Sequence, residues 1–195
     1  MKKRWFLLYS LTAILFLSSC KNNKQPTTQT NTDTTSFFPV NDYLATDIKD
    51  VVQTPYFIYK KTIINNKQTD SIVISKKEFE QLANEFLQRN ITAIALKSFY
   101  KPALFNDLST KSITFTYTAL KDDLPVRMVS VLLDDETNKL KHVFITAVTT
   151  NKDSTITEQL SWKAGKSFRI NRFIEKANGS KTEESNFINW NDKFL

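Results

Sequence analysis

The 195-residue chain has only two glycines, Gly165 and Gly179. Phosphate-binding loops of the Walker type and dinucleotide-binding turns use several glycines, because the backbone must come close to a phosphate group. A Gly-x-Ser-x-Gly nucleophile turn also needs two glycines within one short segment. The scarcity of glycine therefore excludes these nucleotide-binding loops and the nucleophile turn of the α/β-hydrolases.

The chain also has a single cysteine, Cys20, and a single histidine, His142. No His/Cys zinc site is expected, since such a site takes three or four ligands, and one cysteine cannot form an internal disulfide. His142 lies in an alternating segment, 141–148, and is expected to sit on a sheet face without a catalytic role. We expect no cofactor and no metal.

Paired carboxylates are the remaining candidates for catalysis: Asp122-Asp123, Asp134-Asp135 and Glu183-Glu184. Glycoside cleavage needs two carboxyl groups about 5–10 Å apart, a distance that a sequence does not give. The run Asp134-Asp135-Glu136 could contact calcium, but it lacks the spaced ligands and the glycine of an EF-hand loop. We expect a solvated hairpin turn at Asp134-Asp135-Glu136 and no catalytic role for the three pairs.

No apolar run reaches the roughly 20 residues of a permanent transmembrane helix. A shorter run, Phe6 to Leu17, follows Lys2, Lys3 and Arg4, and this length and these flanks are typical of a signal peptide. The segment that follows, Leu17-Ser18-Ser19-Cys20, resembles the lipobox at which bacterial lipoprotein precursors are lipidated and cut. The resemblance implies that Cys20 is acylated and holds the protein on a lipid bilayer.

The residue after the cysteine influences the sorting of such lipoproteins. Here it is Lys21, not the aspartate that resembles an inner-membrane retention signal in many Gram-negative bacteria. The resemblance therefore implies an outer membrane, with the protein facing the periplasm. A cell-surface lipoprotein of a single-membrane bacterium is the alternative.

Loss of residues 1–19 lowers the formal charge from +7 to +4. Basic residues are spread along the chain, so no nucleic-acid partner is expected. Residues 21–36 contain no large apolar side chain and are predicted to be disordered. We therefore expect a signal peptide (1–19), a lipidated Cys20 with a disordered tether (20–38), and a single globular domain (39–195).

Capping and periodicity predict two helices. The first covers 41–53 with Asn41 as its cap. The second runs from Ser75 to about Asn90, because Ser75 and Glu78 suit a capping box and an apolar stripe follows. Between the helices, two β-rich runs form a hairpin across 65–68. The segment 91–110 has no clear pattern and is not assigned.

From residue 112 onward, six alternating segments are separated by short polar turns, and Asn178-Gly179 is the strongest hairpin signal. Short connections make neighbouring strands antiparallel, because parallel neighbours need long crossovers. We expect an α+β fold, in which about two helices cover one face of a curved antiparallel β-meander.

Three functions stay open for this domain. The leading one is a non-enzymatic binding or scaffold module anchored to the outer membrane. The second is a carrier of lipid or another apolar ligand, similar only in outline to periplasmic lipoprotein carriers, with aromatics such as Trp162 and Trp190 lining a groove. The third is a carboxylate-dependent hydrolase. A closed apolar cavity would favour the carrier, and two converging carboxyl groups in a cleft would favour the hydrolase. The absence of both features would favour the binding or scaffold module.

Lipidation at Cys20 can be tested directly. Cells fed an alkynyl fatty acid should label the wild-type protein, and Cys20→Ala should lose the label, because the acyl chains attach to this residue. Equal labelling of the two proteins would refute the assignment. Cys20→Ser, which keeps a small polar side chain, serves as the matched second variant.

Overall fold

A computed structural model describes residues 37–190, which lie within one unit of the chain. The predicted signal peptide, Cys20 and the segment 21–36 lie outside these residues. The helices are α1 (Val40–Gln53), α2 (Lys76–Leu87) and α3 (Ile94–Lys97). The strands are β1 (Ile58–Ile64), β2 (Lys67–Ile74), β3 (Tyr100–Asp107), β4 (Ser112–Ala119), β5 (Val126–Asp134), β6 (Leu140–Thr150), β7 (Ser154–Lys163), β8 (Ser167–Lys176) and β9 (Lys181–Asn189).

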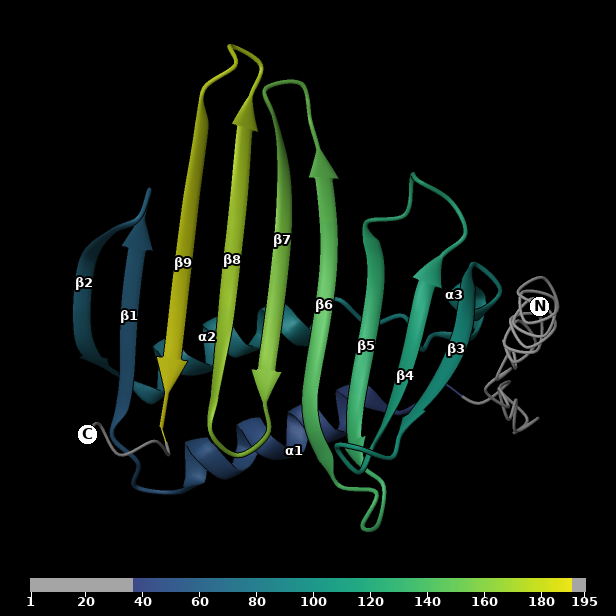
Figure 1. Ribbon diagram of the computed structural model, residues 1–195. Helices are drawn as coiled ribbons and strands as arrows, with labels where there is room; N and C mark the ends of the chain where they lie inside the picture. Colours follow the sequence, from purple (N-terminus) through teal and green to yellow (C-terminus); the bar gives the residue numbers. More distant parts are fainter. Residues whose placement is uncertain (1–36, 191–195) are drawn as a thin grey trace, which may run out of the picture. The chain divides into compact units, whose positions relative to one another are not determined.

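The nine strands within residues 37–190 form one antiparallel sheet in the order β2-β1-β9-β8-β7-β6-β5-β4-β3 (Figure 1). The six predicted strands from residue 112 onward are confirmed as β4 to β9, each paired with the next. The predicted hairpin β1–β2 extends the same sheet, because β1 pairs with β9. Strands make up 52% and helices 19% of the described residues, so the fold is β-rich and the helices are secondary to an open sheet.

The unassigned segment 91–110 contains the short helix α3 and the edge strand β3. Pro102 lies within β3, opposite Tyr117 of β4. A proline cannot donate to a second neighbour, so it is tolerated in a strand that has a partner on one side only. The position of β3 at the end of the sheet therefore explains why Pro102 interrupts the sequence pattern without interrupting the strand.

Helices α1 and α2 cross the sheet on one face (Figure 1). The apolar stripe of α2 is confirmed, since Phe79, Ala83 and Phe86 are each fully buried. Phe86 packs edge-on against Trp162 and Phe168, with ring centroids 5.1 and 5.3 Å away. Among residues 37–190, no helix combines the length and the apolar character that a membrane span requires.

Helix α1 is anchored to the sheet through Asp47. One oxygen of its carboxylate, Oδ2, accepts hydrogen bonds from Trp162 Nε1 at 2.8 Å and from the Gly165 backbone N–H at 2.9 Å. Gly165 has a φ of 66°, a left-handed value that favours glycine, in the turn between β7 and β8. One carboxylate therefore joins α1 to both a core side chain and this turn.

The predicted cap at Asn41 is wrong. Helix α1 begins one residue earlier, at Val40, and no side chain caps its first turn. Asn41 lies inside α1, where its Nδ2 donates instead to the carbonyl of Leu87 at the end of α2, at 2.9 Å. The Asn41 side chain therefore forms a tertiary contact between the two helices, whereas the local sequence suggests that it caps α1.

The predicted capping box at α2 is half formed. Ser75 Oγ accepts from the Glu78 backbone N–H at 3.2 Å. The Glu78 carboxylate pairs instead with Lys60 Nζ of β1, at 2.5 Å. The start of α2 is thus fixed both by its cap and by an ion pair to the neighbouring strand.

An ion cluster lies between the C-terminal end of α2 and the sheet. Arg172 of β8 pairs with Glu85, with Glu158 (3.1 Å) and with Glu184 (3.6 Å), and Arg89 pairs with Glu158 as well. Burial by itself would lower the pKa of Arg172, but the carboxylates of Glu85 and Glu158 raise it above its ordinary value. Arg172 therefore stays charged, which the buried Glu158 requires.

The contribution of the α2 stripe can be measured by urea denaturation. Phe86→Ala removes a fully buried ring and should lower the free energy of unfolding by about 3–5 kcal/mol. Gln81→Ala, on the exposed side of the same helix, should lower it by less than about 0.5 kcal/mol. Similar denaturation midpoints for the two variants would contradict this packing.

Candidate functional site

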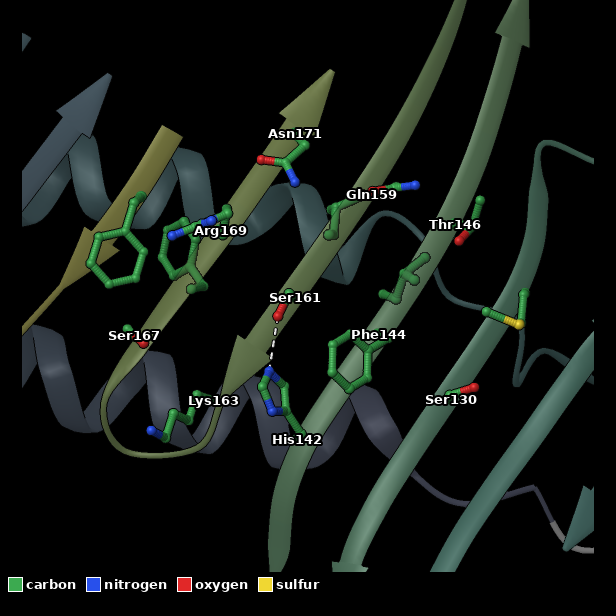
Figure 2. A pocket seen from close by; sticks show the side chains of 15 residues that line it. Ser130, His142, Phe144, Thr146, Gln159, Ser161, Lys163, Ser167, Arg169 and Asn171 are labelled. Atoms are coloured by element: carbon green, nitrogen blue, oxygen red, sulfur yellow. Dashed lines mark hydrogen bonds between the residues drawn. The ribbon is translucent and has the colours of Figure 1, made fainter. Parts of the chain in front are cut away.

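The face of the sheet opposite α1 and α2, here called the open face, carries a hollow of about 670 Å³ (Figure 2). We call it the His142 hollow. Its lining comes from β5, β6, β7, β8 and β9. The side chains that give it its chemistry are Ser130, His142, Phe144, Thr146, Gln159, Ser161, Lys163, Arg169, Asn171 and Phe187.

Alternation along the strands places these side chains on the open face. In β7, Leu160 and Trp162 are buried on the helix side, so Ser161 and Lys163 point the other way. The short turn at Gly165 then sets the register between β7 and β8, with Ser161 opposite Arg169. The apolar residues that build the core therefore also determine which polar residues line the hollow.

His142 is held by two neighbours in the hollow. Its Nε2 lies 2.8 Å from Ser161 Oγ, and its ring stacks on Phe144 with centroids 4.2 Å apart (Figure 2). Burial, and then the charge of Lys163, lower the pKa of His142 below its ordinary value. The imidazole is therefore neutral near pH 7, and Nε2 can accept the proton of the Ser161 hydroxyl.

A serine hydroxyl next to a neutral imidazole is the starting point for nucleophilic catalysis, which also needs a group that orients the imidazole. Among residues 37–190, no carboxylate is hydrogen-bonded or ion-paired to His142. The described residues therefore provide a Ser161–His142 pair and not a complete triad.

Two cationic side chains lie beside this pair. Lys163 and Arg169 are exposed on the open face, and the Arg169 guanidinium lies over the Phe187 ring, with its Cζ 5.1 Å from the ring centroid. No aspartate or glutamate lines the hollow. The His142 hollow is therefore electropositive.

The paired carboxylates lie elsewhere. Asp122 is fully exposed, 3.9 Å from Arg127. Asp134 pairs with Lys141 at 3.0 Å and accepts from the Thr137 backbone N–H within the β5–β6 turn. The hydrogen bond from Lys141 is the largest cause, and those from Thr137 come next, of a pKa of Asp134 that lies well below its ordinary value. Asp134 therefore acts as a turn residue, as the sequence predicts.

Glu183 and Glu184 point to opposite faces of β9, since successive residues of a strand alternate. Glu184 joins the ion cluster through Arg172. Glu183 shares a separate open hollow of about 470 Å³ with Glu175, and Glu175 pairs with Lys181 at 3.3 Å. Both glutamates of this second hollow are exposed, whereas an acid catalyst is usually a carboxyl group shielded from water.

Both tryptophans of the described chain belong to the core. Trp162 is 0% exposed and Trp190 is 5% exposed. Both lie on the helix side of the sheet, so neither lines the His142 hollow.

A narrow cavity near Arg89 and Tyr117 has a volume of about 10 Å³, the space of a single water molecule. Among the residues that the structure describes, no group of three or more potential ligands could hold a metal ion.

Sequence reasoning missed Ser161, Lys163 and Arg169 as site residues. The alternation patterns in 159–163 and 167–171 contain enough information to place Ser161, Lys163 and Arg169 on the same face once the strands are joined by the turn at Gly165. They do not place His142 beside Ser161, because that contact depends on the register between β6 and β7.

Comparison with protein families, with curated proteins and with solved structures finds no match to this chain.

The depressed pKa of His142 predicts a pH effect on stability. The folded state resists protonation of this residue, so it loses stability as the pH falls through the unfolded-state pKa, about 6.5, toward the lower folded-state value. His142→Gln should therefore lose less stability than the wild type between pH 7.5 and pH 5.5. Urea midpoints at the two pH values measure this difference.

Thr146→Ala, a change in the same hollow that keeps the histidine, is the matched control and should retain the wild-type pH dependence. If His142→Gln and wild type lose equal stability on acidification, His142 does not titrate in the way that its surroundings indicate.

Proposed function

We propose that this chain is a lipid-anchored, non-enzymatic binding module of the bacterial cell envelope, held on the outer membrane through Cys20. The open face of the sheet would be its binding surface. The His142 hollow is the observation that carries this proposal, because its volume lies within the roughly 300–1,000 Å³ of ligand sites.

The side chains of the hollow support binding rather than packing. Thr146, Gln159 and Asn171 point into it, and none of the three side chains is hydrogen-bonded to another residue in 37–190 (Figure 2). They lie on the open face (Figure 2), which α1 and α2 leave uncovered (Figure 1). Their donors and acceptors are therefore available to a ligand.

A carrier of acyl chains fits this geometry less well. The His142 hollow is open to solvent and does not separate an apolar chain from water. The large aromatic side chains that could have lined such a chain, Trp162 and Trp190, are buried under α1 and α2.

The second candidate is a serine hydrolase. The 2.8 Å contact between His142 Nε2 and Ser161 Oγ favours it, since an activated serine needs a base at this distance. It differs from the hydrolase that the sequence leaves as its third alternative, which would use paired carboxylates.

Chemical labelling of lysines can test the binding module. An amine-reactive reagent should modify Lys163 less in intact cell envelopes than in the purified full-length protein, because a bound ligand shields it. Lys101, an exposed lysine on the same face but in the edge strand β3, is the control and should react equally in both samples. Mass spectrometry reads the modification at each lysine.

Equal reactivity of Lys163 in envelopes and in the purified protein would refute an occupied hollow. The same purified protein can be treated with a fluorophosphonate, which labels activated serines. Labelling that is lost in Ser161→Ala would replace the binding module with the serine hydrolase.

A further inference from the structure

We propose that the His142 hollow binds an anionic sugar, one that carries a carboxylate or a phosphate group, and that Arg169 and Lys163 hold this anionic group. The inference names the ligand class of the same site and therefore rests on the proposed function. Three features of the open face support it: its charge, its hydrogen-bonding groups and its exposed rings.

The charge comes from cations without carboxylate partners. Lys163 on β7, Arg169 on β8 and Lys61 on β1 all point to the open face, and none forms an ion pair within residues 37–190. Lys181, further along the same side of the sheet, is by contrast neutralised by Glu175 at 3.3 Å. A hollow with unbalanced positive charge attracts an anion.

Arg169 is also oriented for such an anion. Its Cζ lies 5.1 Å from the centroid of the Phe187 ring, so the guanidinium is placed over this ring on the open face. The guanidinium N–H groups of Arg169 make no hydrogen bond to another described residue. A guanidinium presented in this way can donate two parallel hydrogen bonds to a carboxylate or phosphate.

The remaining lining favours a sugar over an acyl chain. The hydroxyls and amides of Thr146, Gln159 and Asn171 could pair with sugar hydroxyls. An acyl chain would instead cover these groups without offering them partners, which is costly. Phe144, 42% exposed beside His142, provides a ring on which the apolar face of a sugar can lie.

The two ends of the open face differ in a way that agrees with this ligand. The cations gather near the β7–β8 turn, whereas the separate hollow near the β8–β9 turn contains Glu175, Glu183 and Lys181, and therefore carries one negative charge in excess. An anionic ligand is therefore attracted to the His142 hollow and repelled from the second hollow.

The test uses the full-length protein in mild detergent and isothermal titration calorimetry at about 50 mM salt. Trigalacturonate and glucose 6-phosphate are the anionic probes, and maltotriose is the neutral one. At least one anionic probe should bind ten times more tightly than maltotriose, or better. The double variant Arg169→Gln/Lys163→Gln should weaken that binding at least tenfold, because both cations are removed.

Lys101→Gln is the matched control, since it removes one positive charge from the same face at an exposed position. Its affinity should stay within twofold of wild type. Both substituted cations of the double variant are exposed, and an unchanged thermal midpoint would verify that this variant is folded.

The inference is overturned if neither anionic sugar binds at millimolar concentration, or if the double variant binds as the wild type does. Binding to vesicles of phosphatidylglycerol, without binding to the sugars, would overturn it in favour of a lipid headgroup. Protection of Lys163 in envelopes without sugar binding would refute the ligand class alone, whereas absence of protection would refute the binding module itself.

Discussion

A cluster of five aromatic side chains between α2 and the sheet is the interaction on which the rest of this structure depends. Phe79 and Phe86 of α2 meet Trp162, Phe168 and Trp190, with ring centroids 5.0–6.2 Å apart. Buried rings of this size dominate core energetics. Because they come from α2, β7, β8 and the residue after β9, they hold the helix on the middle of the sheet and decide which face it covers.

The packing of these rings also determines which side chains lie on the open face. Once Leu160 and Trp162 face the helices, the period of two in a strand sends Ser161 and Lys163 to the other side. The Ser161–His142 contact, the electropositive hollow and the exposed Phe144 therefore exist because the aromatic core selects the opposite residues. The ion cluster around Arg172 extends the covered face beyond the rings and closes the C-terminal end of α2 against the sheet.

Local sequence predicted the elements whose signals are local. Strands β4 to β9 were recognisable because each alternates and each turn is short, and the α2 stripe was recognisable from its helical spacing. Asn41 was misassigned as a cap because the carbonyl of Leu87, 46 residues away, takes its side chain. Strand β3 was not recognised, because Pro102 is acceptable only at an edge, and the edge position is a property of the whole sheet.

The sequence by itself determined the connectivity of the meander, since tight turns allow only antiparallel neighbours, and it determined which residues alternate together in each strand. The tertiary structure alone decided that β1 pairs with β9, that Glu158 and Arg172 meet beneath α2, and that His142 lies 2.8 Å from Ser161. The physical reason is range: periodicity and turn chemistry act over a few residues, whereas register and face are set by packing between segments far apart in the chain.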